Sequence, residues 1–291
     1  MSKIESSELI INPDGSVFHL HLKPGQIADK IILVGDPGRV ELIADMFSKV
    51  EHRASNREMV TATGEYKGVR MSVISTGIGT DNIDIVVTEL DALVNVDFES
   101  RSIKDEKTQL TLVRLGTSGA LQPNIELGTN ILAETSAGFD GLLNFYAGRD
   151  SVCDLELESA FTRHMGWNPL LAKPYFVNSS LELNSAFRDF TTGGITISSP
   201  GFYGPQGRVV RLPLADPAIN AKLEAFRHNG RRIMNYEMES SALAGLSALL
   251  GHRATTICTI IAQRVNKQAN PDYRPFVVKM IESALDRLAG I

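Results

Sequence analysis

The sequence has little of what marks disulfide-rich, metal-binding or membrane-spanning proteins. Its two cysteines, Cys153 and Cys258, are far apart and lie in or near apolar stretches, which argues against a disulfide framework. The six histidines form neither a His-x-x-His nor a His-Glu-x-x-His pattern, so no metal-ligand spacing is present. No run of about 18 apolar residues occurs, and we therefore predict no membrane span.

The sequence also has no large excess of positive or negative charge. The formal net charge is −5, and no basic block exceeds the pair Arg231 and Arg232. This gives little support to nucleic-acid or membrane-surface partners. Residues 1–15 are polar and acidic and lack the apolar core of a signal peptide, so we expect a cytoplasmic protein. Small anions stay open as ligands, because arginines can be concentrated locally.

What is present suits a globular α/β protein. Hydrophobic residues make up 43% of the 291 residues, enough for a large buried core. Apolar runs bounded by glycine predict strands, and apolar residues at intervals of three and four predict helices. Their alternation predicts a single domain over residues 1–291, with a weakly ordered start at 1–15 and a three-layer α/β fold around a largely parallel sheet. The expected strands cover 31–34, 69–76, 110–115, 130–134, 194–198 and 255–262, and the expected helices cover 37–47, 82–94, 239–250 and 275–288.

Residues 139–190 are the least regular part of the sequence. They contain the only tryptophan, Trp167, among mixed charged and aromatic residues. We expect helices and excursions there that line a cleft or a subunit contact.

Residues 35–39, Gly-Asp-Pro-Gly-Arg, follow the first expected strand directly. Asp36 is a good N-cap and Pro37 a good first helical residue. Free backbone N–H groups at such a helix start attract an anion, to which Arg39 would add a forked cationic donor. A plain strand-to-helix turn with a solvated Arg39 is the alternative.

Two further glycine-rich segments follow strands. Residues 76–82, Thr-Gly-Ile-Gly-Thr-Asp-Asn, lack the full dinucleotide fingerprint, so close backbone packing is an equally good interpretation. Arg114 leads from an apolar strand into a predicted Gly-Thr-Ser-Gly turn. A buried arginine needs an anionic partner. Phosphate would serve, with Thr117 adding a hydroxyl donor, and so would an ion pair with Glu237 or Glu239.

Residues 235–240, Asn-Tyr-Glu-Met-Glu-Ser, bring two carboxylates close together. In an extended segment Glu237 and Glu239 face the same side. One of them would accept hydrogen bonds from vicinal sugar hydroxyls while the other pairs with an arginine. Acidity at a helix start, which complements the helix dipole, is the alternative.

Residues 202–208, Phe-Tyr-Gly-Pro-Gln-Gly-Arg, suit the polar edge of a flat base. Gln206 offers a carbonyl and an amide, and Arg208 offers donors only, which together match the O2, N3–H and O4 groups of uracil. Phe202 could stack on the ring. A fixed arginine stabilises the charge on a departing uracil more than it stabilises neutral uridine. A turn with exposed polar residues is the alternative.

Together these motifs resemble the nucleoside phosphorylase I family, most closely its uridine phosphorylases. The resemblance runs from about residue 16 to 266, leaves 139–190 unmatched, and implies a three-layer αβα fold with a mixed, partly barrel-like central sheet. It rests on Val-Phe-His-Leu at 17–20, residues 35–39, Asn-Arg-Glu at 56–58, Ser-Thr-Gly-Ile-Gly at 75–79, Arg-Leu-Gly-Thr-Ser-Gly at 114–119, residues 202–208 and 235–240, and Gln-Arg at 263–264.

The resemblance also implies a reaction and a site. The reaction is phosphorolysis of uridine to uracil and ribose 1-phosphate, a pentosyl transfer of nucleoside salvage. The reaction needs no metal or organic cofactor, and inorganic phosphate is its co-substrate. Homodimers or hexamers would share sites between subunits. Phosphate would be held by Gly35, Arg39, Arg114, Thr117 and Arg57 of the neighbouring subunit; ribose by Met238, Glu239 and the neighbour's His19; and the base by Gly119, Phe202, Gln206 and Arg208. Glu237 and Arg264 would support the site, and the residues expected to act in catalysis are Arg39, Arg114, Thr117, Arg208 and Glu239.

The chain departs from the family pattern at three places. Gly204–Pro205 reverses the usual Pro-Gly order, and Gln263 replaces the usual asparagine. Thr-Asp-Asn at 80–82 replaces Gly-Pro-Ser, which puts a monovalent-cation site at the subunit contact in doubt.

Three other functions compete with this interpretation. A purine nucleoside phosphorylase would use an aspartate near the late strand, where Ala-Gln-Arg stands at 262–264. A nucleosidase attacks with water and needs no cage of arginines such as Arg39, Arg57 and Arg114. A nucleoside-binding protein without turnover would not need an intact set of phosphate residues.

Overall fold

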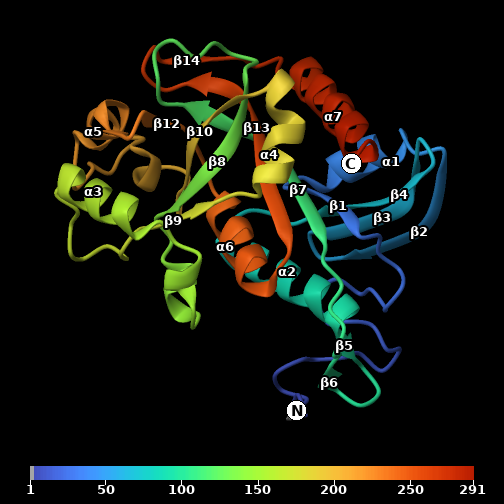
Figure 1. The fold of residues 1–291 in the computed structure, drawn as a ribbon. Helices are drawn as coiled ribbons and strands as arrows, with labels where there is room; N and C mark the ends of the chain where they lie inside the picture. The colour runs from blue at the N-terminus through green and yellow to red at the C-terminus, as the bar shows by residue number, and fades with distance from the viewer. Residues whose placement is uncertain (1–2) are drawn as a thin grey trace.

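The structure, a computed structural model, describes residues 3–291; residues 1 and 2, part of the predicted weakly ordered start, lie outside it. One sheet of twelve strands runs through the molecule (Figure 1). Its strands are β1 (Lys30–Val34), β2 (Lys49–Asn56), β3 (Met59–Tyr66), β4 (Val69–Ser75), β7 (Thr111–Ala120), β8 (Asn130–Gly138), β9 (Tyr175–Asn178), β10 (Thr192–Ser198), β11 (Arg227–His228), β12 (Arg231–Glu237), β13 (Arg253–Gln263) and β14 (Gln268–Ala269), while β5 (Val96–Asp97) and β6 (Ser102–Ile103) form a separate hairpin.

Helices cover the sheet and fill the connections between strands. The α-helices are α1 (Pro37–Ala44), α2 (Thr80–Asn95), α3 (Leu155–Met165), α4 (Leu181–Phe187), α5 (Ile219–Ala225), α6 (Ser240–Leu250) and α7 (Arg274–Ala289). Single 3₁₀ turns are η1 (Leu142–Phe145), η2 (Arg149–Ser151), η3 (Arg188–Phe190) and η4 (Gly204–Gln206). Among residues 3–291, no helix combines the length and the apolar character that crossing a bilayer requires.

The sheet is mixed, and part of it closes on itself. Its order is β11-β12-β10-β8-β13-β7-β1-β4-β3-β2, and β12 also pairs with β7 at Asn235 and Ala120. The strands β7, β13, β8, β10 and β12 therefore form a ring, which confirms the partly barrel-like αβα fold. The largely parallel sheet predicted from the alternation is wrong, because β2–β3–β4 is an antiparallel meander and β8 runs antiparallel to β13.

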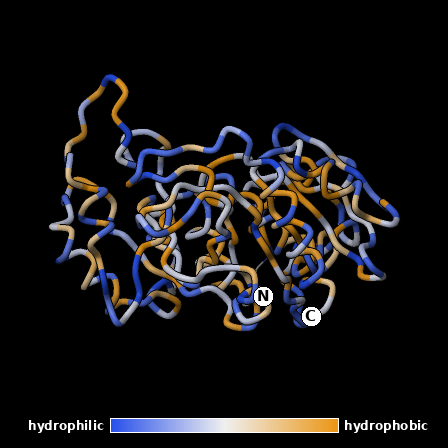
Figure 2. The backbone as a smooth tube through the Cα atoms, turned by 90° about the horizontal axis from the view of Figure 1, so that it is seen from above, coloured by the Kyte–Doolittle hydropathy of each residue, from blue (hydrophilic) through white to orange (hydrophobic). Residues whose placement is uncertain are grey.

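The side chains of β1 point alternately toward the two helical layers that cover the sheet. Ile31 and Leu33 belong to the apolar cluster that contains the buried faces of α2 and α6. Ile32 and Val34 belong to the cluster that contains α1, α4 and α7. Successive side chains of a strand point to opposite faces, so a continuous apolar strand is buried on both sides. Figure 2 shows hydrophobic segments concentrated in the centre of the molecule and hydrophilic segments in many outer turns.

Residues 139–190 are divided between two places: α3 lies beside α5 at one flank of the molecule, whereas α4 packs beside α7 over the sheet (Figure 1). They contain α3, α4 and β9, which confirms the predicted helices. Phe161 of α3 packs against Phe139, Trp167 and Phe226 with ring centroids between 5.2 and 5.7 Å apart. A cavity of about 600 Å³ opens against Phe139 and Trp167, so the predicted cleft is present. A subunit contact in this region stays a prediction.

The start of the chain packs against α2 and the β5–β6 hairpin. The Ile4 backbone N–H donates to the Arg101 carbonyl over 2.8 Å. Leu9 is buried and lies in an apolar cluster with Ala92 and Val96. Over residues 3–15 the weakly ordered start that we expected is therefore replaced by a packed segment, because its few apolar side chains find an apolar surface.

The largest correction to the predicted elements concerns β7. The Gly-Thr-Ser-Gly turn expected after Arg114 is wrong, since the strand continues to Ala120. Gly116, Thr117 and Ser118 pair with Cys258, Thr259 and Ile260 of β13. Glycine and hydroxyl residues usually favour turns, but here a neighbouring strand satisfies their backbone groups, so the segment stays extended.

Candidate active site

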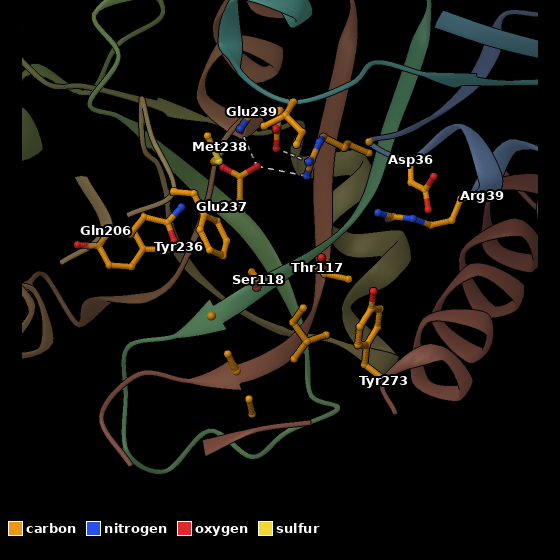
Figure 3. Close-up of a pocket in the computed structure, with 18 of the residues that line it drawn as sticks. Asp36, Arg39, Thr117, Ser118, Gln206, Tyr236, Glu237, Met238, Glu239 and Tyr273 are labelled. Atoms are coloured by element: carbon orange, nitrogen blue, oxygen red, sulfur yellow. Dashed lines mark hydrogen bonds and ion pairs between the residues drawn. The ribbon is translucent and has the colours of Figure 1, made fainter. Parts of the chain in front are cut away.

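A cavity of about 640 Å³ opens at the carboxyl ends of β1, β4, β7 and β12 (Figure 3). This is the edge of an α/β sheet at which loops converge and ligands usually bind. The lining combines glycine-rich backbone, three arginines, three carboxylates and apolar side chains. It consists of Gly35, Asp36, Pro37, Arg39, Gly77, Ile78, Arg114, Thr117, Ser118, Gly119, Phe202, Gln206, Arg208, Tyr236, Glu237, Met238, Glu239, Ile261, Ala262, Ala269, Asn270 and Tyr273.

One end of the cavity is the start of α1. Asp36 caps this helix by accepting a hydrogen bond from the Gly38 N–H over 2.9 Å, and Pro37 is its first residue, as predicted. The guanidinium of Arg39 is anchored by donating to the Leu115 carbonyl over 3.1 Å. Burial, and then the nearby charge of Arg114, lower the pKa of Arg39. Two like charges held close together at a helix start favour an anion between them.

Arg114 lies at the centre of the cavity and is buried. It is paired with Glu237, with an Nη1 to Oε2 distance of 3.2 Å, and with Glu239 through Nη2 (Figure 3). Burial opposes its charge, but Glu239 and Glu237 more than compensate and raise the pKa of Arg114. Its Nε atom is buried and finds no acceptor in the part of the chain that the structure describes. The sequence left open which glutamate would pair with Arg114, and the structure pairs it with both.

The two carboxylates have different surroundings. Glu237 accepts hydrogen bonds from the hydroxyls of Ser198 and Ser240, over 2.6 and 2.7 Å, and from the Glu239 N–H over 2.9 Å. Glu237 is therefore saturated by the protein and can act only by holding Arg114. Glu239 accepts a hydrogen bond from the Gly79 N–H over 2.8 Å and lines the cavity. Its carboxylate can therefore accept further hydrogen bonds from a molecule in the cavity.

The close contacts of the loop at residues 76–79 explain why glycine occurs in it. Gly77 has a φ of 69°, and a Cβ there would lie 2.6 Å from the Asn82 amide and 2.8 Å from the Glu58 side chain. This tight packing agrees with the close-approach interpretation of the segment, and it aims the Gly79 N–H at Glu239.

The opposite end of the cavity is formed by residues 202–208. Gln206 is buried, and Arg208 donates to its Oε1 and to the Phe202 carbonyl. The Arg208 guanidinium carbon lies 3.7 Å from the centroid of the Phe202 ring. Burial, and then the charge of Arg264, lower the pKa of Arg208 to about 10. Before a ligand binds, the groups expected to recognise a base therefore satisfy one another.

Arg264 lies behind this end of the site. It donates from Nη2 to the Gln206 carbonyl over 3.1 Å, and its aliphatic stem lies against Gly119, where a Cβ would approach it to 3.2 Å. Gln263 points away and donates to the Gln122 and Ile125 carbonyls over 2.8 and 2.9 Å. Gln263, which stands where the family usually has asparagine, therefore holds the loop at residues 122–125. Arg264 instead holds the backbone of Gln206.

Apart from Arg264, which lies behind the base end, the predicted site residues come together in this one cavity with two exceptions. Arg57 lies at the exposed turn between β2 and β3, and it does not line the cavity of its own chain. His19 is also outside the cavity, and its Nδ1 lies 2.6 Å from the Glu89 carboxylate. These are the residues that the resemblance assigned to the neighbouring subunit. The residues brought together are Gly35, Arg39, Arg114, Thr117, Gly119, Phe202, Gln206, Arg208, Glu237, Met238 and Glu239.

Sequence reasoning missed two aromatic residues of the lining. Tyr236 is buried between the two ends of the cavity, and its hydroxyl donates to the Asn220 side chain over 3.1 Å. It lies inside the motif at 235–240, so its neighbours were the available signal. Tyr273 precedes α7 and lies about 34 positions beyond the last acidic motif residue. No pattern around Tyr273 marks it as part of a site.

The structure offers no metal centre in the part that it describes. Among residues 3–291 no three side chains of histidine, cysteine, aspartate or glutamate are grouped so that they could hold a metal ion. The cavity itself combines arginine, carboxylate and hydroxyl side chains with glycine-rich backbone.

Known proteins are similar to this chain in sequence and in fold. The family model of the phosphorylase superfamily matches residues 29–291. The uridine phosphorylase of Thermococcus kodakarensis is 31% identical over 276 residues, which cover 92% of this chain and 85% of that protein. A DeoD-type purine nucleoside phosphorylase of Streptococcus suis is 30% identical over 251 residues, which cover 86% of this chain and 88% of that protein.

A solved structure extends the comparison to three dimensions. The crystal structure of a Trypanosoma brucei nucleoside phosphorylase that shows uridine phosphorylase activity matches with a TM-score of 0.89 and 28% identity. The match covers 97% of this chain and 100% of that chain. Because the family model and these relatives span almost the whole chain, the protein belongs to the phosphorylase superfamily.

Proposed function

We propose that this protein is a uridine phosphorylase, which uses inorganic phosphate to cleave uridine into uracil and ribose 1-phosphate. The observation that carries the proposal is the order of groups along one cavity. Arg39 and Thr117 lie at one end, Met238 and Glu239 lie above the centre, and Gln206 lies at the other end (Figure 3). The cavity therefore provides separate places for phosphate, ribose and base. They are arranged in the order in which phosphate attacks the ribose and the base leaves it.

Phosphate occupies the end formed by the α1 start. The Gly35 backbone, the Arg39 and Arg114 guanidiniums and the Thr117 hydroxyl provide donors on neighbouring walls. They hold one phosphate oxygen in line with C1′ of the ribosyl group. The rate gain then comes from alignment and from fixed positive charge, because the protein need not form a covalent intermediate.

Ribose lies against Met238 and Glu239. The Glu239 carboxylate accepts hydrogen bonds from the vicinal hydroxyls, and Arg114 fixes its orientation. As the glycosidic bond stretches, positive charge develops on the sugar, and an anionic carboxylate beside it becomes more stabilising than in the ground state.

Uracil is recognised by Gln206 and Arg208. The Gln206 amide can meet N3–H and one carbonyl of the ring, and Arg208 can meet the other carbonyl. To do so, Arg208 exchanges its present hydrogen bond to Gln206 for one to the base. Because uracil leaves as an anion, a fixed guanidinium stabilises the transition state more than it stabilises the neutral substrate.

Purine phosphorolysis is the second candidate, since a purine nucleoside phosphorylase is also similar to this chain. Purine chemistry favours a carboxyl group that can hold or protonate N7 of the leaving base. The acidic residues of the lining are all engaged elsewhere: Asp36 caps α1, and Glu237 and Glu239 are paired with Arg114. The base end offers an amide and a guanidinium, which suits a pyrimidine.

The balance of charge supports a site shared between two subunits. In one chain Arg39 and Arg114 face the two carboxylates Glu237 and Glu239, so the cavity has no net positive charge for a phosphate dianion. Arg57 from a second copy would supply that charge, and His19 would approach the ribose. We therefore propose a homodimer, or a hexamer built from dimers, as the active form. No cofactor beyond the co-substrate phosphate enters the proposed reaction.

The test is uracil release from uridine, with and without inorganic phosphate, and with inosine as a parallel substrate. Phosphate-dependent release from uridine, with little release of hypoxanthine, is the expected result. Release that does not depend on phosphate would mean hydrolysis and would contradict the assignment of Arg39 and Arg114. Activity on inosine alone would leave the phosphate end intact and contradict the roles of Gln206 and Arg208.

A further inference from the structure

Tyr273 presents a hydroxyl group to the phosphate end of the cavity. It precedes α7 and belongs to the lining, and in Figure 3 its hydroxyl points toward Thr117, on the same side as Arg39 and away from Gln206. Its side chain is 41% exposed. Within residues 3–291 this hydroxyl forms no hydrogen bond with the protein, whereas the hydroxyls of Tyr66, Tyr146, Tyr175 and Tyr236 all do.

The backbone on both sides of Tyr273 is held in place. On one side, the Asn270 N–H donates to the Ile261 carbonyl over 2.9 Å, and the Asn270 side chain accepts from the Asp272 N–H over 2.9 Å. On the other side, the Tyr273 carbonyl accepts from the N–H groups of Phe276 and Val277, which begins α7. The ring is therefore carried by an ordered corner, and its hydroxyl is placed before any ligand arrives.

Tyr273 and Arg39 line the same cavity, and in Figure 3 both lie on the side of Thr117 away from Gln206. Burial and the charge of Arg114 lower the pKa of Arg39. An anion bound at Arg39 would therefore lie in the part of the cavity toward which the Tyr273 hydroxyl points.

A neutral donor is useful at this position. Both carboxylates near Arg114 already reduce the positive potential of the site, and a phosphate dianion has more acceptor sites than Arg39 and Thr117 can satisfy. A hydrogen bond from a neutral group to a charged oxygen is among the stronger ones, and its loss typically weakens binding about ten- to a hundredfold. It also adds no cation whose own desolvation would have to be offset.

We propose that Tyr273 is a phosphate-binding residue, whose hydroxyl donates a hydrogen bond to the co-substrate from the α7 side, opposite the start of α1. This inference rests on the proposed phosphorolytic function. It makes the corner between β14 and α7 part of the phosphate site, and it assigns that corner to phosphate rather than to ribose or base.

The test compares Tyr273→Phe with the unaltered protein in steady-state uridine phosphorolysis. Phenylalanine keeps the ring and the backbone corner and removes only the hydroxyl. We expect the KM for phosphate to rise about tenfold, the KM for uridine to change less than about twofold, and kcat at saturating phosphate to stay within about threefold. Tyr66→Phe is the matched control, because Tyr66 lies in β3 and outside the lining, and it should leave all three constants unchanged.

A second measurement does not depend on turnover. Inorganic phosphate should raise the melting temperature of the unaltered protein and of Tyr66→Phe, and at the same concentration it should raise that of Tyr273→Phe by less. Each shift is referred to the same variant without phosphate, so a change in basal stability does not obscure the result.

The outcomes separate the two proposals. An unaltered protein without phosphate-dependent uracil release would overturn the proposed function. An active unaltered protein, with the same KM for phosphate and the same thermal shift in Tyr273→Phe, would overturn the role of Tyr273 alone. A raised KM for uridine with an unchanged KM for phosphate would place the hydroxyl at the nucleoside and would also overturn it.

Discussion

At the scale of single residues, the site depends on a buried arginine that is outnumbered by carboxylates. Removing one partner of such a group leaves a buried charge without compensation, which typically costs about 3–5 kcal/mol. Arg114 is therefore tied to folding as well as to function, and its replacement is a poor probe of catalysis. Arg208 and Glu239 are better probes, because each faces the cavity with capacity for a ligand.

Arg208→Ala should lower kcat/KM for uridine by about a hundredfold or more, because the variant loses the group that stabilises the departing uracil. The melting temperature should change little, since Arg208 is only partly buried and bonds within its own loop. Arg211→Ala is the matched control, because Arg211 is exposed three positions further on and does not line the cavity. Equal loss of activity in both variants would contradict the assignment of Arg208 to the base.

The pH dependence of turnover should report on Glu239. Burial, in spite of Arg114 and together with Glu237, raises the pKa of this carboxyl above its usual 4.5. The ionised form holds the sugar hydroxyls, so as the pH falls the active form should be lost at a higher pH than for an ordinary glutamate. We expect kcat at saturating phosphate to decline on an acid limb above pH 4.5.

The control for this prediction is Glu239→Gln. It should lower kcat by about ten- to a thousandfold and remove that acid limb, because glutamine does not titrate. An acid limb that persists unchanged in Glu239→Gln would mean that another group, such as phosphate itself, is responsible for it.

At the scale of elements, β7 carries the centre of the site. Its pleat places Arg114 and Gly116 on one face two residues apart, and a Cβ on Gly116 would lie 2.5 Å from Arg114 Nη1 and 3.0 Å from Cys258 Sγ. The glycine therefore makes room for the guanidinium rather than forming the turn that the sequence suggested. The strand continues to Ala120, and this brings Thr117 and Gly119 into the same cavity.

Gly116→Ala should displace the Arg114 guanidinium, because the nearest atom is the end of a flexible side chain. We expect uridine phosphorolysis to fall at least about tenfold, while overpacking costs about 1–3 kcal/mol of unfolding free energy. The activity and the denaturant midpoint should be measured together. In Gly290→Ala the new methyl group meets only ordinary contacts of 3.5 and 3.7 Å, and this control should keep both values. Full activity in Gly116→Ala would show that the position of Arg114 does not matter for turnover.

At the scale of the whole molecule, the proposed reaction would require residues from more than one chain. The exposed β2–β3 turn with Arg57 and the segment around His19 lie outside the cavity of their own chain. Both would become functional when a second copy brings them to its neighbour's site. Association would then be a condition of catalysis, because only the complete site offsets the charge of phosphate.

Mixing subunits tests this arrangement. Arg57→Ala and Arg208→Ala should each be nearly inactive alone, but mixed dimers contain one site in which both residues are intact. After subunit exchange, the mixture should recover up to about a quarter of the unaltered activity, as random pairing and one intact site per mixed dimer require. Light scattering and exchange of tagged subunits serve as controls. An absence of recovery in spite of confirmed exchange would contradict shared sites.

The sequence by itself determined the parts of this protein that depend on local chemistry. Continuous apolar runs specified β1 and β4, Asp36 and Pro37 specified the start of α1, and three- and four-residue periods specified α2, α6 and α7. Such features arise from interactions between residues close in sequence and from the spacing of apolar side chains. They can therefore be recognised in the sequence alone. The short motifs at 35–39, 202–208 and 235–240 were likewise legible, and all three lie in one cavity.

Only the tertiary structure decided the features that depend on pairing between distant segments. The polar strand β2, the extension of β7 and the antiparallel contact of β12 with β7 are stabilised by neighbours far away in sequence. The same holds for the site. Arg114 is paired with two glutamates more than 100 positions away, and Tyr273 becomes a cavity residue only because β14 and α7 turn the chain back over β7. A local pattern cannot encode such contacts, since their energy arises only when the sheet has closed.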